Sequence, residues 1–320
     1  MHYDVFNGDA DGICSLIQLR LSNPKNSKLI TGVKRDISLL KKIRPVRQDS
    51  VTVLDISMKK NYQEVVDFLE FGVKIFYADH HQSGDLLTHK NFRSYINKSS
   101  NICTSLIINQ YLSGKYQKWA IVGAYGDGMD ESARIIANNI GLSKDDREQL
   151  KLLGECINYN SYGTNESDLF YHPTVLYNKL KSSLNPIDFI RNEPDIYSNI
   201  LDNYHMDMYK AKAILPEVKS DNFSVIILPD ELWSKRIIGV YANLLMHSDK
   251  NCAHALMIPN KDKDYLVGVR APYNNKVGAD ILCSMFGGGG RKGAAGINNL
   301  PRQEKNNFIK EFKKKFTINA

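Results

Sequence analysis

A carboxylate and two imidazoles directly follow one apolar run of the chain. Asp79, His80 and His81 come immediately after residues 73–78, which read Val-Lys-Ile-Phe-Tyr-Ala. A run of this kind predicts a buried strand, and a turn requires neither two adjacent imidazoles nor a carboxylate before them. We therefore interpret the triplet as a functional site at the carboxyl end of a strand, where open α/β sheets bind their ligands.

Two earlier apolar runs also end in polar side chains. The first is followed by Asn7, Asp9 and Asp11, and the second by Asp55. Taken alone, each pattern also fits a turn or a helix cap. Taken together with the imidazoles, these oxygen ligands suit Mn²⁺ or Mg²⁺. If the strands lie side by side in one sheet, the carboxylates converge, and a cation is needed to offset their repulsion.

Strand-like and helix-like segments alternate in the first half of the chain. We expect strands near residues 2–6, 28–33, 50–55 and 73–78, and helices near 12–21, 36–43 and 61–71. This alternation predicts an α/β protein with a doubly wound, mainly parallel sheet. Helical patterns follow over 104–112, 117–125, 131–140 and 144–158.

A second alternating unit begins near residue 221. Its expected strands are 223–228, 252–259 and 265–271, and its expected helices are 232–247, 277–286 and 302–316. We therefore predict a catalytic domain over 1–182, a helical connector over 183–220 and a second, smaller α/β domain over 221–320, with a cleft between the domains.

Composition narrows the class of protein. The chain has 320 residues, 42% hydrophobic and 24% charged, as in ordinary soluble proteins. It contains no apolar run of membrane-spanning length and no signal-like start, so we expect a cytoplasmic protein without membrane contact. Its five cysteines form no Cys-x-x-Cys pair, which argues against a disulfide framework or a zinc ribbon. The net charge of +7 favours a polyanionic partner.

The order of these motifs resembles the DHH phosphoesterase superfamily over nearly the whole chain. The matching segments are Asn-Gly-Asp-Ala-Asp-Gly at 7–12, Asp55, the Asp79-His80-His81 triplet, Gly126-Asp127 and a late glycine cluster. The resemblance implies two Mn²⁺ or Mg²⁺ ions that activate a water for in-line attack on phosphorus. By the same resemblance, Asp9 would hold one ion, and Asp11, His80 and Asp127 would hold the other. Asp55 would bridge the two ions.

The other members of the triplet are expected to support this chemistry. Asp79 would orient His80 by accepting a hydrogen bond. His81 would face the phosphate as a hydrogen-bond donor or as the acid for the leaving oxygen; the alternative is a packed histidine with no chemical role.

The sequence departs from the family pattern at two places. Val5 and Asn7 occupy positions where members usually carry a histidine or an acidic residue, so one ion would be bound more weakly, with the amide oxygen of Asn7 as a neutral ligand. Arg291 replaces the histidine usual in the late glycine cluster.

Several residues are expected to bind the substrate. Gly288, Gly289 and Gly290 expose backbone N–H groups that could cradle a phosphate, and Arg291 and Arg270 could clamp it. Alternatively, the glycines form a simple connector. Asn160 and Tyr162 could contact a base; the alternative is a surface loop with half-buried tyrosines.

The sequence therefore predicts a metal-dependent phosphoesterase acting on short oligonucleotides, dinucleotides or phosphorylated nucleotides. An inorganic pyrophosphatase or polyphosphatase is the second interpretation, because basic groups suffice to bind its substrate. A non-catalytic nucleotide sensor is the third. The oligomeric state stays open, with a homodimer as one alternative.

Overall fold

The computed structural model describes residues 1–85, 87–260 and 264–317. The chain divides into two compact units, Met1–Leu201 and Asp202–Ala320. The division falls within helix α9 (Pro194–Lys212), inside the range 183–220 expected to connect two domains.

The first unit is built on a five-stranded parallel sheet in the order β2-β1-β3-β4-β5. Its strands are β1 (His2–Phe6), β2 (Lys28–Ile30), β3 (Ser50–Leu54), β4 (Lys74–Asp79) and β5 (Phe92–Ile96). The chain passes from β1 outward to β2 and then returns to β3 on the other side of β1. The carboxyl ends of β1 and β3 therefore border the point where the strand order reverses, which is where such sheets bind ligands.

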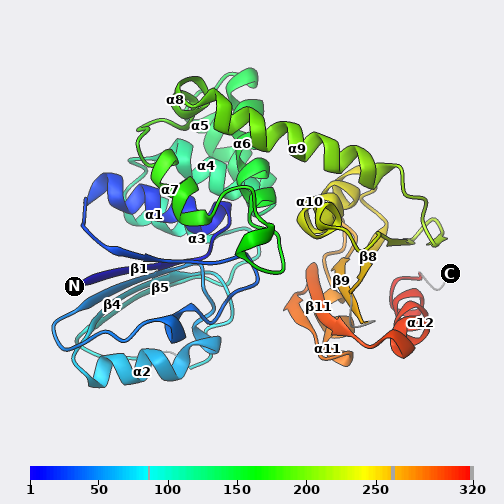
Figure 1. Cartoon of the computed structure of the whole chain (residues 1–320), viewed down its shortest axis with the longest axis horizontal. Helices are drawn as coiled ribbons and strands as arrows, with labels where there is room; N and C mark the ends of the chain where they lie inside the picture. The colour runs from blue at the N-terminus through cyan, green and yellow to red at the C-terminus, as the bar shows by residue number, and fades with distance from the viewer. Residues whose placement is uncertain (86, 261–263, 318–320) are drawn as a thin grey trace. The chain divides into compact units, whose positions relative to one another are not determined.

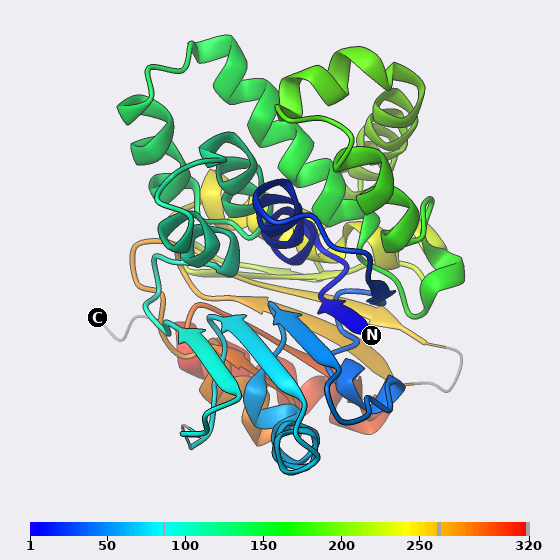
Figure 2. The same ribbon diagram turned by 90° about the vertical axis from the view of Figure 1, so that its left-hand side faces the viewer.

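Helices cover both faces of this sheet. Figure 1 and Figure 2 show α2 (Tyr62–Glu70) on one face and α1 (Ala10–Ser22) on the other. The α2 face holds an apolar core in which inward side chains of the strands pack against Val65 and Leu69. The other helices of the unit are α3 (Thr104–Tyr111), α4 (Gln117–Gly126), α5 (Asp130–Asn139), α6 (Lys144–Asn160), α7 (Pro173–Leu180) and α8 (Pro186–Asn192). The predicted doubly wound fold is confirmed.

Two local expectations in this unit were wrong. The helix expected near 36–43 is only a 3₁₀ turn, η1 (Leu39–Lys42), because so short a segment gains too few hydrogen bonds to offset helix nucleation. Strand β5 was not expected, since its half-exposed sequence Phe-Arg-Ser-Tyr-Ile has no continuous apolar run; it forms the sheet edge by pairing with β4. Two further 3₁₀ turns are η2 (Met58–Lys60) and η3 (Glu166–Asp168).

The second unit contains a six-stranded sheet in the order β10-β11-β9-β8-β7-β6. Its strands are β6 (Val218–Lys219), β7 (Phe223–Ile227), β8 (Ala253–Pro259), β9 (Tyr265–Arg270), β10 (Gly289–Arg291) and β11 (Ala294–Leu300). Only β7 and β8 pair in parallel. The glycine cluster, expected as a loop, forms β10 and the start of β11. β10 pairs with β11 and β11 pairs with β9, and this pairing overrides the low strand propensity of glycine.

Helices also flank this second sheet. Helix α10 (Leu232–Ser248) packs against β8 and β9, and the α-carbon of Gly268 in β9 faces Ile238. The opposite side of β9, with Val267 and Val269, joins an apolar core with α11 (Ala279–Met285) and α12 (Lys305–Phe316). A 3₁₀ turn, η4 (Arg302–Glu304), precedes α12.

The five cysteines are all buried and free. Among the described residues, no helix combines the length and the apolar character needed to cross a membrane.

Candidate metal centre

The predicted ligands come together at the carboxyl edge of the first sheet. Asp9 and Asp11 lie where β1 passes into α1, Asp55 follows β3, and His80 follows β4. Asp127 ends α4 as its C-cap, and its side chain is 8% exposed. The other four residues are buried. Residues far apart in the sequence thus form one cluster of carboxylates around an imidazole.

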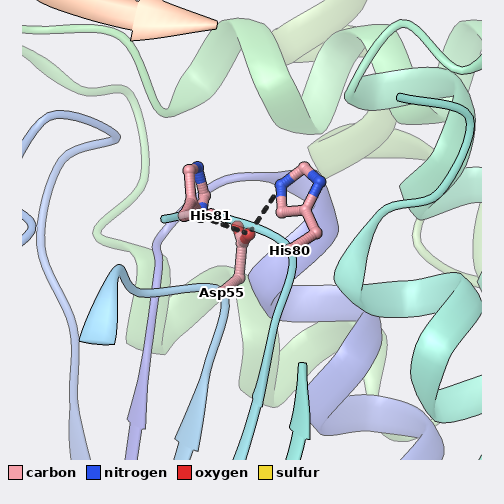
Figure 3. Close-up of side chains that lie close together, drawn as sticks. All are labelled: Asp55, His80 and His81. Atoms are coloured by element: carbon pink, nitrogen blue, oxygen red, sulfur yellow. Dashed lines mark ion pairs between the residues drawn. The ribbon is translucent and has the colours of Figure 1, made fainter. Parts of the chain in front are cut away.

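His80 lies beside three of these carboxylates, and Figure 3 shows His80 and His81 on either side of one of them, Asp55. Its Nδ1 donates to the carbonyl oxygen of Ile102 at 2.9 Å, which leaves Nε2 directed at carboxylates. Nε2 lies 3.4 Å from Asp55 Oδ1, 3.9 Å from Asp11 Oδ2 and 3.8 Å from Asp127 Oδ2. Metal-binding histidines are held in this way, with one ring nitrogen hydrogen-bonded and the other facing the ion.

The donor set fits a divalent ion. One imidazole nitrogen and three carboxylate oxygens surround a small volume, and the triads Asp11–His80–Asp127 and Asp55–His80–His81 each bring one donor atom per residue within 4.8 Å of one another. Mostly oxygen donors with one imidazole suit Mn²⁺ or Mg²⁺ better than a metal that prefers thiolates.

Asp11 also supports helix α3. Its Oδ2 accepts from the backbone N–H of Thr104 at 2.7 Å, and its Oδ1 accepts from the N–H of Ser105 at 2.6 Å. The helix's own N-cap, Cys103, makes no side-chain capping bond, so a carboxylate from α1 satisfies the free N–H groups instead. A second lone pair on each oxygen is still available to an ion.

Asp55 is held in an unusual backbone conformation with φ of 59°. Asp and Asn tolerate this left-handed region better than most residues. Thr104 Oγ1 donates to Asp55 Oδ1 at 3.1 Å. Burial raises the pKa of Asp55 well above its ordinary value, and the charges of Asp11 and Asp9 raise it further. A cation is therefore needed to hold this side chain as a carboxylate.

Asp79 was expected to orient His80, and the structure contradicts this expectation. Asp79 Oδ1 lies 2.7 Å from Nδ1 of His81, whereas His80 is oriented by the backbone of Ile102. The two imidazoles leave β4 in different directions, so a buried carboxylate at the strand end reaches only the second of them. Burial lowers the pKa of His81, but the adjacent Asp79 carboxylate outweighs burial and raises it above its ordinary value.

Sequence reasoning missed Lys34, which lies in the segment between β2 and η1. Its Nζ forms an ion pair with Asp9 Oδ2, lies 3.0 Å from Asn158 Oδ1 and lies 3.7 Å from Asp127 Oδ1. Burial would raise the pKa of Asp9, but the Lys34 ammonium outweighs burial and holds it below its usual value. A single lysine in a loop gives no signal in the sequence, because only the fold places it beside the carboxylates.

Asn7 holds the Lys34 segment in place. Its Nδ2 donates to the Lys34 carbonyl oxygen at 3.1 Å, and its Oδ1 accepts from the Asp9 N–H at 3.3 Å. The role of metal ligand predicted for Asn7 stays a prediction.

Asn160 and Tyr162 differ in their surroundings. Asn160 lies at the end of α6, fully buried, where its Nδ2 donates to the Tyr171 carbonyl oxygen at 2.8 Å and its Oδ1 accepts from the Tyr171 N–H at 3.0 Å. This geometry contradicts the expected contact of Asn160 with a base, because both the Nδ2 and the Oδ1 of its amide are hydrogen-bonded to the backbone of Tyr171. Tyr162 is half-buried, with its ring centroid 5.7 Å from Lys34 Nζ.

The residues expected to bind substrate in the second unit lie on its sheet. Arg270, at the end of β9, donates to Asn243 Oδ1 at 2.7 Å and to the Gly239 carbonyl oxygen at 3.3 Å, so α10 fixes its guanidinium. Gly288 precedes β10, and Gly289, Gly290 and Arg291 form that exposed edge strand. A side chain at Gly288 would collide with the Gly296 carbonyl oxygen at 2.3 Å, which gives this glycine a packing reason independent of any ligand.

No protein-family model matches the sequence, and no curated protein matches it. Solved structures do resemble it. A DHH-domain protein described as a member of a family of ribosomal proteins has 13% identity and a TM-score of 0.68, over 98% of this chain and 85% of that one. RecJ from Thermus thermophilus, in complex with Mn²⁺, has 14% identity and a TM-score of 0.63 over 99% of this chain, which spans 52% of RecJ. The pGpG-specific phosphodiesterase PggH from Vibrio cholerae has 12% identity and a TM-score of 0.55, over 98% of both chains.

The resemblance predicted from the motifs is confirmed at the level of the fold: the chain has the fold of the DHH-domain proteins.

Proposed function

We propose that the chain is a cytoplasmic, metal-dependent phosphoesterase that cleaves short oligonucleotides, dinucleotides or phosphorylated nucleotides. The observation that carries this proposal is the position of His80, whose Nε2 lies 3.4–3.9 Å from three carboxylates supplied by three separate elements. Two proteins of the same fold support it, namely RecJ in complex with Mn²⁺ and a pGpG-specific phosphodiesterase.

Different residues of the chain would bind the ion, donate the proton and bind the substrate phosphate. A divalent ion bound to the cluster would polarise the phosphoryl oxygens and lower the pKa of a water. The residues that would hold it are Asp11, Asp55, His80 and Asp127. His81, whose Nδ1 is held by Asp79, would present the proton on its Nε2 to the leaving oxygen. Gly288–Gly290, Arg291 and Arg270 of the second unit would bind the substrate phosphate.

A purely binding protein is the weaker interpretation. Three carboxylates lie around one imidazole and repel one another, and a protein that only binds nucleotides has no need to maintain them at this cost. Such a group of carboxylates is expected where a bound metal ion offsets their negative charges.

The test is a substrate panel in buffer containing Mn²⁺. It comprises linear dinucleotides, cyclic dinucleotides, adenosine bisphosphate and pyrophosphate, assayed with wild type and with Asp55→Asn. This variant keeps the left-handed backbone and the acceptor for Thr104 but loses the charge, so its fold should survive. We expect cleavage of at least one phosphate ester by wild type and a loss on the order of 100-fold or more in Asp55→Asn. Release of phosphate from pyrophosphate alone would favour a pyrophosphatase, and no Mn²⁺-dependent turnover of any substrate would overturn the proposal.

A further inference from the structure

Lys34 already supplies a positive charge inside the acidic cluster. Its ammonium contacts two carboxylates and one amide oxygen, those of Asp9, Asp127 and Asn158. Two of its three donors are directed to Asp9 and Asn158, and Asp127 lies at a longer, ion-pair distance. These oxygens are also the kind of hard oxygen ligands that would otherwise surround a divalent ion.

The backbone holds Lys34 in this position. Its N–H donates to the Ser161 carbonyl oxygen at 2.9 Å, and its own carbonyl oxygen accepts from Asn7 at 3.1 Å. Its side chain is 25% exposed. The lysine is therefore fixed at both backbone polar groups and at its charged end, unlike a surface lysine that samples many rotamers.

Both oxygens of Asp9 are engaged. Oδ1 accepts from the Gly12 N–H at 3.0 Å as the N-cap of α1, and Oδ2 carries the Lys34 ammonium. The oxygens of Asp11, by contrast, accept from the neutral backbone N–H groups of Thr104 and Ser105. A neutral donor leaves a carboxylate free to bind an ion as well, whereas an ammonium repels a second cation on the same group.

Asp127 lies between the Lys34 ammonium and the predicted ion site at His80. Its Oδ1 is 3.7 Å from Lys34 Nζ, and its Oδ2 is 3.8 Å from His80 Nε2. One carboxylate thus faces the ammonium on one side and the predicted ion site on the other, as a residue shared by two cations would.

We propose that Lys34 replaces one of the two metal ions implied by the resemblance, so that this centre holds one divalent ion, at His80, and one ammonium, at Asp9. The proposal rests on the proposed function and makes it a one-metal phosphoesterase. The ammonium would supply the second positive charge beside the substrate's phosphoryl group. The proposal also agrees with the residues at positions 5 and 7, which are Val5 and Asn7 and not a histidine or an acidic residue. A metal ion would use such a ligand, whereas the Lys34 ammonium does not need one.

The test is the number of Mn²⁺ ions bound per chain, measured by equilibrium dialysis in excess Mn²⁺ and elemental analysis. Wild type should bind one ion. Lys34→Met, which keeps the unbranched side chain and removes the charge, should bind two, as should Lys34→Gln. Electron paramagnetic resonance provides a second readout: isolated Mn²⁺ in wild type, and an exchange-coupled pair in the neutral variants.

Lys151→Met is the matched control. Lys151 also pairs with carboxylates, those of Asp130 and Glu155, and its ammonium lies 5.9 Å from the Tyr125 ring centroid, much as Lys34 lies beside Tyr162. This control should bind one ion. Two bound ions in wild type, or none, would overturn the proposal. One bound ion in a neutral Lys34 variant would also overturn it, provided that the variant gives the wild-type circular dichroism spectrum.

Ion counting separates this inference from the proposed function. If wild type binds one ion, the neutral variants bind two and no phosphate ester is cleaved, the inference stands and the phosphoesterase activity is refuted. If esters are cleaved by a wild type that binds two ions, the activity stands and the role of Lys34 is refuted.

Discussion

His80 and His81 are neighbours in sequence with different partners. Nδ1 of His80 donates to a backbone carbonyl oxygen, while Nδ1 of His81 meets the Asp79 carboxylate at 2.7 Å. The Ile102 carbonyl oxygen holds the proton on Nδ1 of His80 and leaves Nε2 directed at the carboxylates, whereas the Asp79 carboxylate outweighs burial and raises the pKa of His81. The backbone at the end of β4 thereby directs the His80 ring toward the proposed ion site and places the His81 ring for the proposed proton transfer.

The acid role of His81 predicts a dependence on the leaving group. In His81→Asn, kcat for a dinucleotide should fall by about 100-fold or more, because a ribose oxygen needs a proton to leave. With bis(p-nitrophenyl) phosphate the loss should be much smaller, since p-nitrophenolate leaves without one. Steady-state kinetics on both substrates measures the difference. The exposed His205 is the control, as His205→Asn should change neither rate. An equal loss on the two substrates would assign His81 to structure or binding.

Local sequence patterns predict well those site residues that lie at the ends of strands. Asp55 and His80 directly follow β3 and β4, Asp9 and Asp11 lie where β1 passes into α1, and the parallel sheet brings those strand ends together. Lys34 could not be found in this way, because it leaves β2 in an irregular segment and reaches Asp9 through tertiary contacts with Asn7 and Ser161. Strands β10 and β11 were missed for a related reason: their pairing with each other, and that of β11 with β9, decides their conformation.

Helix α4 places Asp127 through close helix packing. A side chain at Gly126 would meet the Ala10 Cβ at 2.3 Å and the Gly154 carbonyl oxygen at 2.8 Å. Gly126 directly precedes Asp127, so the separation of α1, α4 and α6 at this point sets the position of a predicted ligand.

Gly126→Ala should therefore affect both stability and ion binding. Overpacking at this contact should lower the free energy of unfolding by about 1–3 kcal/mol, and the displaced Asp127 should weaken Mn²⁺ binding. Urea unfolding and Mn²⁺ titration calorimetry measure the two effects. Lys118→Ala, on the partly exposed side of the same helix, should change stability by less than about 0.5 kcal/mol and leave Mn²⁺ affinity unchanged. Wild-type affinity in a destabilised Gly126→Ala would show that Asp127 does not depend on this contact.

At the scale of the molecule, the second unit contains a buried histidine inside its sheet. His254 in β8 is 3% exposed, and its Nδ1 lies 2.8 Å from Ser224 Oγ in the paired strand β7. Burial lowers the pKa of His254 from 6.5 to about 4, and the opposing charge of Asp249 is too weak to restore it. His254 is therefore neutral in the folded protein at pH values where it is protonated in the unfolded chain.

This difference makes the stability of the protein depend on pH with a definite sign. The contribution of neutral His254 is fully present above pH 6.5 and is lost as the pH falls toward 4, because the unfolded state then binds the additional proton. Between pH 7 and pH 5 the loss from this residue should be about 2 kcal/mol. In His254→Gln, which can still hydrogen-bond Ser224, the fall in unfolding free energy over this range should be smaller by that amount, as measured by urea unfolding of the full chain. His205→Asn should retain the wild-type pH dependence, since His205 is exposed. Identical pH dependences for wild type and His254→Gln would mean that His254 keeps its ordinary pKa in the folded sheet.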